Sequence, residues 1–481
     1  MLISELKEQI KQLAQAGSVL DPDAGTRGKA TTEVQQYADA FLGRLSSART
    51  FIQDGYDDAA LSDTNFSSGH DIASVLQLLE QHMENPGINT AHGGHLGYIP
   101  GGGLYAAALG DYLADVTNKY AGVFYASPGA VRIENALIEW SGNLVGYEKG
   151  FGGNITSGGS IANLVAVTTA RDAKNIKAKD FDRTVIYTTS QAHHCVDKAI
   201  IIAGLRESIV RKVAMDSQYR MDVAALQQQI EKDKAAGLLP FMVIANAGST
   251  DVGAIDPMMA ISNVAREHDL WMHVDAAYGG YFLLLDDYRK KFDGIQHADS
   301  IVMDPHKGMF LPYGTGIVLV KHIHHLQNAF AYEANYMQDT VHVAAGISPA
   351  DVSPELSKHF RGMRMWLPLK LYGEQAFKDC LREKLLLTEY FKQQILQLGF
   401  EVICEPELSV ITYRYVPPTG DANDFNKRLL EAMHKDGEIF ISSTLVNGQY
   451  VLRFACLSFR THLEHVDKLL DMLKRHRDSL L

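Results

Sequence analysis

Short apolar runs alternate with amphipathic stretches through the middle of the chain. Between about residues 150 and 320, segments such as 222–233 and 257–269 carry apolar residues at helical spacing. The apolar runs between them span 184–188, 209–215, 241–247, 270–276, 299–304 and 316–321. Because strands that alternate with helices form βαβ units, the pattern predicts an α/β domain with a mainly parallel sheet. Ligands of such sheets bind beyond the carboxyl ends of the strands, so the polar residues after each run are the candidates for chemistry.

The two flanking parts of the chain have patterns of their own. Residues 2–13 repeat leucine and isoleucine at steps of three and four, and the helical runs that follow carry too few apolar residues for a core. We expect this segment to pack on another domain or another subunit. Beyond the sheet region, a long helix from 373 and two later helices accompany strands expected at 400–405, 410–416, 438–443 and 450–456. The predicted parts are an N-terminal helical segment, a large α/β domain and a small α+β domain, at 1–90, 91–372 and 373–481.

Composition narrows the class of protein. The formal net charge of −12 and the sequence pI near 5.9 argue against a nucleic-acid partner, which would require a basic face. The four cysteines lack C-x-x-C spacing, which disfavours a disulfide framework or a zinc site and indicates free thiols in a reducing cytoplasm. The first twenty residues lack the continuous apolar region of a signal peptide, and no run of about 18 apolar residues predicts a membrane span.

Two charged residues follow predicted strands in apolar surroundings. Lys307 precedes Met309, Phe310 and Leu311, and a lysine in an apolar pocket loses its charge readily and becomes a nucleophile toward carbonyls. The alternative is an ordinary solvated lysine. Asp275 ends the most apolar strand and is either a structural acid or the partner of a buried cation. A carboxylate about 4 Å from a pyridinium nitrogen is worth about 4 kcal/mol at an effective dielectric of about 20, enough to keep such a ring protonated.

Three further strand ends carry polar or small residues. Glycines and hydroxyls at 152–160, including Gly159 and Ser160, precede a helix and predict either an anion site or a plain tight turn. His193 follows the strand at 184–188 and is either a structural histidine or a ring that stacks on a planar ligand. Thr250 lies in the loop after the strand at 241–247. Taken together, five strand ends present the groups that one flat, phosphorylated, cationic cofactor needs, which points to pyridoxal 5′-phosphate (PLP).

Longer motifs carry a family resemblance. HVDAAYGG at 273–280 and DPHKG at 304–308 are the most specific, and SGGSIAN, QAHHC, FRGMRMW and VLRFACLS support them. With these motifs the chain resembles the group II PLP-dependent decarboxylases, which act on aromatic amino acids, histidine or glutamate, from about residue 90 to the end. The resemblance implies PLP fold type I, similar to aspartate aminotransferase, with a mainly parallel seven-stranded sheet in the large domain. It also implies a homodimer with active sites at the interface, to which the N-terminal helices contribute.

The same resemblance implies a role for each matching residue. Lys307 is the Schiff-base lysine, and the other residues implied at the cofactor are Gly159, Ser160, His193, Thr250, Asp275, Ala277 and His306. Of these, Asp275 would bind the ring nitrogen and Ala277 would lie under the ring. His193 would stack on the ring and is also implied as a catalytic residue that handles protons. Tyr336, in the loop EANYMQD, is the candidate proton donor to the substrate carbon, and Tyr332 is its close competitor.

Two departures from the family pattern concern the substrate and the phosphate. HGGHLGYIPGGG at 92–103 replaces the family's H-P-x-F-x-x-x-x-P, so His95 and Tyr98 become candidate substrate contacts. Asp304 replaces the asparagine of N-P-H-K and brings a negative charge near the phosphate region. We expect the Asp304 side chain to point away or to pair with a base.

The resemblance implies α-decarboxylation of an L-amino acid, aromatic by default, to the amine and CO₂. Acidic or aliphatic substrates stay open, and so does decarboxylation coupled to oxidative deamination, which gives an aldehyde. Because the loop tyrosine and His193 are both present, simple decarboxylation is favoured. A lyase for phosphorylated substrates and a non-catalytic homologue are more remote, since Lys307, Asp275 and His193 are all retained.

Overall fold

The computed structural model describes residues 2–53, 59–84, 86–331 and 347–481. Its centre is a seven-stranded sheet with strand order β3-β9-β8-β7-β6-β4-β5. Only β9 runs against its neighbours, so the mainly parallel sheet predicted from the sequence is confirmed. The strands are β3 (Gly152–Thr156), β4 (Thr184–Thr188), β5 (Ile209–Lys212), β6 (Leu239–Asn246), β7 (Trp271–Asp275), β8 (Ser300–Met303) and β9 (Gly316–Val320).

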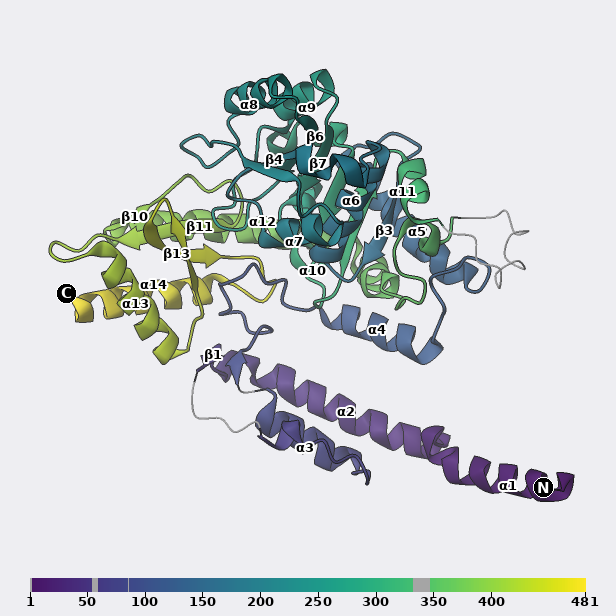
Figure 1. Cartoon of the computed structure of the whole chain (residues 1–481). Helices are drawn as coiled ribbons and strands as arrows, with labels where there is room; N and C mark the ends of the chain where they lie inside the picture. Colours follow the sequence, from purple (N-terminus) through teal and green to yellow (C-terminus); the bar gives the residue numbers. More distant parts are fainter. Residues whose placement is uncertain (1, 54–58, 85, 332–346) are drawn as a thin grey trace.

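Helices cover both faces of this sheet (Figure 1). One face packs on α6 (Gly159–Ala173), α7 (His194–Ile202) and α11 (Ile323–Phe330), and the other packs on α5 (Pro128–Val145), α8 (Val223–Ala235) and α9 (Met258–Glu267). Alternate residues of each strand point to opposite faces. In β4, for example, Val185 and Tyr187 join one apolar cluster and Ile186 joins the other. A strand buried on both faces therefore reads as a continuous apolar run.

One strand was missed because glycines begin it. The sequence analysis predicted either an anion site or a tight turn at 152–160, but residues 152–156 form β3, which pairs with β9. A Cβ atom on Gly152 would lie 2.3 Å from the Ile323 side chain, and one on Gly153 would lie 2.3 Å from the Val318 carbonyl oxygen. Neighbouring groups thus occupy the space that side chains of this strand would need.

The N-terminal helices lie apart from the sheet (Figure 1). α1 (Ile3–Ala16), α2 (Ala24–Arg44) and α3 (Ile72–His82) have no buried residue, which confirms that this segment has no core of its own. β1 (Phe51–Ile52), between α2 and α3, pairs antiparallel with β2 (Gly87–Ile88), which comes after α3, and α4 (Tyr105–Thr117) follows. None of the described helices is both long and apolar enough to cross a membrane.

The C-terminal part is a separate antiparallel sheet with its own apolar cluster. Its elements are β10 (Phe400–Val402), β11 (Val410–Tyr415), α13 (Ala422–Asp436), β12 (Ser442–Val446), β13 (Gln449–Ala455) and α14 (Leu463–Leu480). The strand predicted at 438–443 is displaced, because Phe440 forms a bridge with His95 and β12 begins at Ser442. The helix predicted from 373 is the second half of α12 (Gly362–Gln397), in which Gly373 breaks the helical geometry with φ 68°.

Candidate active site

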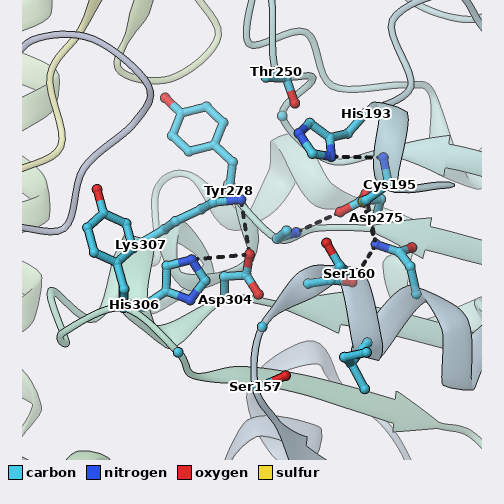
Figure 2. A pocket seen from close by; sticks show the side chains of 18 residues that line it. Ser157, Ser160, His193, Cys195, Thr250, Asp275, Tyr278, Asp304, His306 and Lys307 are labelled. Carbon is cyan, nitrogen blue, oxygen red and sulfur yellow. Dashed lines mark hydrogen bonds and ion pairs between the residues drawn. The ribbon is translucent and has the colours of Figure 1, made fainter. Parts of the chain in front are cut away.

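A pocket of about 380 Å³ opens at the carboxyl ends of the parallel strands (Figure 2). The eight residues that the sequence analysis assigned to the cofactor all line it, from the β3–α6 turn, the start of α7, the loop after β6, the end of β7 and the short helix α10 (Pro305–Gly308). These residues are Gly159, Ser160, His193, Thr250, Asp275, Ala277, His306 and Lys307. The fold thus brings together groups that lie up to 148 positions apart in the sequence.

The Lys307 amine is paired rather than isolated. Its Nζ lies 3.0 Å from Oδ2 of Asp304. Burial lowers the pKa of Lys307, but the carboxylates of Asp304 and Asp275 outweigh burial, so the pKa is raised above its ordinary value. The sequence argument that apolar surroundings would strip this lysine of its charge is therefore wrong. Met309, Phe310 and Leu311 are buried as expected, yet the two carboxylates decide the charge state.

Asp304 lies between two bases and the start of α6. Its Oδ2 is 3.0 Å from Lys307 Nζ and 3.7 Å from Nε2 of His306, which confirms that this carboxylate pairs with a base. The side chain is almost fully buried. A Cβ atom on Gly159 would lie only 2.9 Å from Oδ2, so the carboxylate occupies the space that a side chain at Gly159 would need.

The Asp275 carboxylate is buried at the end of β7 and held by neutral donors. Oδ1 accepts a hydrogen bond from the backbone N–H of Ala277 at 3.1 Å, and Oδ2 accepts one from Nδ2 of Asn163 at 3.3 Å. Among the described residues, the ion pairs of the pocket join Lys307 and His306 to Asp304 and leave Asp275 without one. Because buried charges are usually paired, such a carboxylate fits a ligand that brings its own cation, such as a protonated pyridine ring.

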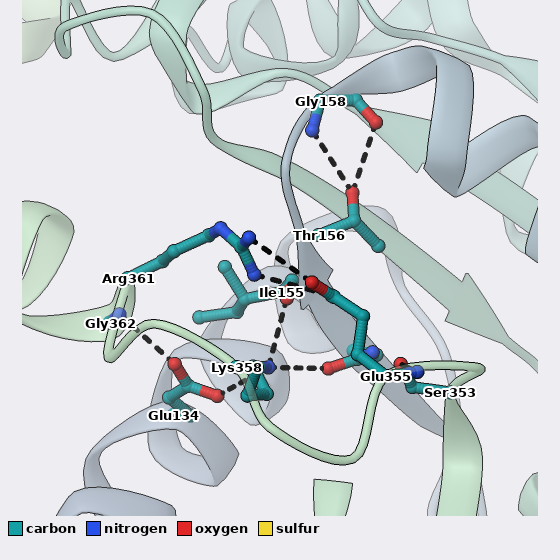
Figure 3. A network of polar contacts seen from close by, with 10 residues as sticks. Glu134, Ile155, Thr156, Gly158, Ser353, Glu355, Lys358, Arg361 and Gly362 are labelled. Carbon is teal, nitrogen blue, oxygen red and sulfur yellow. Dashed lines mark hydrogen bonds and ion pairs between the residues drawn. The ribbon is translucent and has the colours of Figure 1, made fainter. Parts of the chain in front are cut away.

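The β3–α6 turn forms an anion cradle. Gly158 has φ 143°, a conformation that side-chain-bearing residues rarely adopt, and it places the first N–H groups of α6 toward the pocket. Thr156 steadies the turn, because its hydroxyl donates to the Gly158 carbonyl at 3.0 Å and accepts from the Gly158 N–H at 3.3 Å (Figure 3). A helix N-terminus with free N–H groups suits a phosphate. The cradle, the buried carboxylate and the lysine together fit PLP.

A buried lysine supports β3 from behind (Figure 3). Nζ of Lys358 donates to Oε2 of Glu134 at 2.8 Å, to Oδ1 of Asn154 at 2.8 Å and to the Ile155 carbonyl at 2.9 Å. Asn154 and Ile155 lie on β3, the edge strand that pairs with β9 alone. The sequence analysis missed this residue, because Lys358 lies 204 positions from Asn154 and nothing in the local pattern marks it.

His193 and Thr250 are positioned by contacts of different kinds. His193 caps α7, and its Nδ1 accepts a hydrogen bond from the Cys195 N–H at 3.3 Å. Burial, together with His194 and Lys307, lowers the pKa of His193. The Thr250 carbonyl accepts a hydrogen bond from the buried guanidinium of Arg453, in the motif VLRFACLS. The pocket also contains Cys195, Tyr278 and Tyr313, which the sequence analysis did not assign.

Two of the other candidates are described, and both lie away from this pocket. Within the described residues, neither His95 nor Tyr98 lines the pocket: His95 is buried beside Phe440, and Tyr98 is exposed. Their role in substrate binding stays a prediction. Tyr336 and its competitor Tyr332 lie outside the described residues.

Comparison with known proteins places this pocket in a family. The model of the pyridoxal-dependent decarboxylase conserved domain matches residues 57–416. The chain belongs to the pyridoxal-dependent decarboxylase family. It is therefore a PLP-dependent amino acid decarboxylase, a carboxy-lyase. The family membership predicted from HVDAAYGG and DPHKG is confirmed, and so is the cofactor.

Relatives of the chain include both amine-forming and aldehyde-forming enzymes by name. The aromatic-L-amino-acid decarboxylase of Bacillus atrophaeus is 31% identical over 420 residues, which cover 86% of this chain and 87% of the relative. The phenylacetaldehyde synthase of Arabidopsis thaliana is 29% identical over a stretch that covers 80% of this chain and 81% of the relative. Among solved structures, Oryza sativa TDC with PLP and tryptamine superposes with a TM-score of 0.89 at 24% identity, covering 95% and 98% of the two chains. Such structural likeness establishes fold type I for this decarboxylase.

Proposed function

We propose that this decarboxylase acts on an aromatic L-amino acid and releases the amine and CO₂. One observation carries the proposal: Lys307, the buried Asp275 carboxylate and the α6 anion cradle converge on one pocket. PLP, when bound, supplies an electron-withdrawing ring that accepts the electron pair left when the Cα–carboxylate bond breaks.

The side chains of the pocket divide the remaining work. Lys307 would hold the cofactor through its Nζ, and Oδ2 of Asp304, 3.0 Å from Nζ, would be placed to accept a proton from it. The Asp275 carboxylate would hold a proton at the ring nitrogen of the bound cofactor. His193, whose pKa burial lowers, presents a neutral ring that is suited to stacking on a flat group. Gly159 and Ser160 hold the phosphate, with His306 and Thr250 at the edges of the pocket.

A second cavity supports an aromatic substrate. It has a volume of about 390 Å³ and shares His306 and Tyr313 with the first pocket. Its walls are mostly apolar and include Tyr37, Phe41, Tyr105, Leu311 and Pro312. An aromatic substrate side chain buries a large apolar area against such walls.

Among the described residues, Arg460 is the one arginine that lines this cavity, and its guanidinium already binds other groups of the protein. The Arg460 guanidinium donates to the carbonyls of Ala91, Gly102 and Gly103, and it stacks 4.4 Å from the ring centroid of Phe459. These hydrogen bonds already use three of its five N–H donors, which reduces its capacity for the carboxylate of an acidic substrate. This engagement favours aromatic over acidic amino acids.

The aldehyde-forming alternative rests on the phenylacetaldehyde synthases among the relatives. Among members of the family that the chain resembles, replacement of the loop tyrosine or of the stacking histidine favours the aldehyde-forming route. This chain retains His193, and Tyr336 is the predicted loop tyrosine. We therefore propose the amine as the product.

The assembly that we propose is a homodimer in the cytoplasm, with active sites at the interface. Helices α1–α3 bury none of their residues, and α1 exposes Ile3, Leu6, Ile10 and Leu13, with Leu2 exposed just before it. An apolar face of this kind is typical of a segment that another surface covers. Sedimentation of the purified protein tests the dimer, and a monomer at micromolar concentration would contradict it.

We also propose the division into domains at 1–90, 91–372 and 373–481, with the break of α12 at Gly373 marking the last boundary.

An end-point assay on a panel of L-amino acids tests the proposed reaction. CO₂, amine, aldehyde and peroxide are measured together with added PLP, and Lys307→Ala is the control. We expect CO₂ with an equal amount of amine from tyrosine, tryptophan, phenylalanine or dihydroxyphenylalanine, and none from the variant. Release of CO₂ only from glutamate or aspartate would contradict the aromatic assignment. Aldehyde with peroxide would move the enzyme to the oxidative branch.

A further inference from the structure

A line of buried hydrogen bonds runs across the sheet to Asp275. Trp271 Nε1 donates to Oγ of Ser300 at 2.8 Å, and the same Oγ lies 2.8 Å from Nδ1 of His273. Nε2 of His273 lies 2.9 Å from Oδ1 of Asn163, whose Nδ2 donates to Oδ2 of Asp275 at 3.3 Å. Asn163, His273 and Ser300 are fully buried. Three strands or helices thus contribute to one connected polar network.

The chemistry of the end groups gives this line a single direction. Nδ2 of Asn163 also donates to the Gly159 carbonyl at 3.0 Å. Because the Gly159 carbonyl and the Asp275 carboxylate only accept, the amide N–H₂ must face them and Oδ1 must face His273. Nε2 of His273 therefore carries the proton. Its Nδ1 then accepts from the Ser300 hydroxyl, which itself accepts from the indole of Trp271, so every donor points toward Asp275.

Asn163 consequently joins the two ends of the cofactor pocket. One N–H₂ group binds the Gly159 carbonyl, at the anion cradle, and the Asp275 carboxylate, at the opposite end. We propose that Asn163 and His273 are positioning residues that fix the Asp275 carboxylate relative to the phosphate cradle. The inference rests on the proposed assignment of Asp275 and Gly159 to the cofactor.

His273 fixes the orientation of the Asn163 side-chain amide. Burial lowers the pKa of His273, so the ring is neutral near pH 7 and adds no charge beside Asp275. Its Nε2–H holds Oδ1 of Asn163 at 2.9 Å. Without this donor the amide is free to turn by half a rotation, and its oxygen would then face the Asp275 carboxylate. The Trp271–Ser300 pair serves to fix the His273 tautomer.

The test compares ligands that use one or both ends of the pocket. PLP reaches the cradle and Asp275, whereas pyridoxal lacks the phosphate. Dissociation constants of both are measured on the apoenzyme by quenching of tryptophan fluorescence. Since a hydrogen bond to a charged group contributes about 1.5–3 kcal/mol, we expect Asn163→Ala and His273→Leu to weaken PLP binding about 10- to 100-fold and pyridoxal binding much less. His273→Gln retains a donor near the position of Nε2 and should restore most of the PLP affinity.

Several outcomes would overturn the proposal. PLP binding by Asn163→Ala at the wild-type affinity is one, equal weakening of PLP and pyridoxal is another, and a His273→Gln variant as impaired as His273→Leu is a third. Asp275→Asn is measured in the same way. If this variant binds PLP with unchanged affinity, the assignment of the cofactor site itself fails. If Asp275→Asn weakens PLP binding but Asn163→Ala does not, only the proposed role of the hydrogen-bond network is rejected.

A measurement on the wild-type protein covers the case in which variants do not fold. In protein labelled with ¹⁵N-histidine, the His273 resonances should show a neutral ring with its proton on Nε2. A proton on Nδ1, or a charged ring at pH 7, would contradict the hydrogen-bond directions that we assign from Trp271 to Asp275. Thermal unfolding of each apoenzyme variant separates a loss of positioning from a general loss of stability.

Discussion

Replacing Lys358 by methionine should destabilise the large α/β part far more than an ordinary surface substitution. The Lys358 ammonium is fully buried and its partner Glu134 is 2% exposed. Three acceptors surround Nζ at 2.8 to 2.9 Å, and Oε1 of Glu134 accepts from the Gly362 N–H at 3.1 Å (Figure 3). In Lys358→Met, the Glu134 charge and the Ile155 carbonyl lose their donor while they remain in the protein interior.

The expected cost follows from that isolated charge. Removing one partner of a buried ion pair costs about 3–5 kcal/mol, chiefly because the other partner stays buried and charged. The double variant Lys358→Met with Glu134→Gln removes both charges and keeps an oxygen for the Gly362 N–H. We therefore expect the double variant to be more stable than Lys358→Met alone by about 1–3 kcal/mol.

Urea unfolding of the apoenzyme, followed by tryptophan fluorescence, measures both variants. All three tryptophans, Trp140, Trp271 and Trp366, lie outside the C-terminal antiparallel sheet, so the signal reports on the part that holds the pair. Lys212→Met is a matched control, since Lys212 pairs with Asp197 on the surface at 3.3 Å. The control should cost at most about 1 kcal/mol. A similarly small loss in Lys358→Met, or strict additivity in the double variant, would refute the reasoning.

Three further substitutions give separate tests. The pKa of His95 is about 4 in the folded protein against an ordinary value of 6.5, so the unfolded chain binds the proton first as pH falls. The free energy of unfolding of the wild type, measured in urea, should therefore fall between pH 6.5 and 4, and that of His95→Phe should fall less. Asp304→Asn removes a carboxylate that raises the pKa of Lys307, so PLP association with the apoenzyme near pH 7, followed by absorbance, should become faster; an unchanged rate contradicts this. Tyr336→Phe should divert product from amine to aldehyde and peroxide, while Tyr332→Phe should not; the reverse result in the end-point assay would reassign the proton donor.

Much of the fold was predictable because it depends on local pattern. The apolar runs that became β4, β7, β8 and β9 are buried on both faces, and the helices between them are amphipathic. In a parallel sheet such strands end at one edge, so Lys307, Asp275 and His193 could be expected in one pocket from their order alone. The N-terminal helices were recognisable for the opposite reason, since they carry too few apolar residues to form a core.

What the sequence by itself determined is the alternation of elements, the family motifs and the residues at the strand ends, because each is a short-range property of the chain. Only the tertiary structure decided which charges meet. The pKa of Lys307 rises because Asp304 and Asp275 face it, against the expectation from its apolar neighbours. The Asn163–His273 contact joins residues 110 positions apart, and the β3 strand depends on Ile323 and Val318 filling the space beside its glycines. Contacts of this kind arise when distant segments pack, and no local periodicity records them.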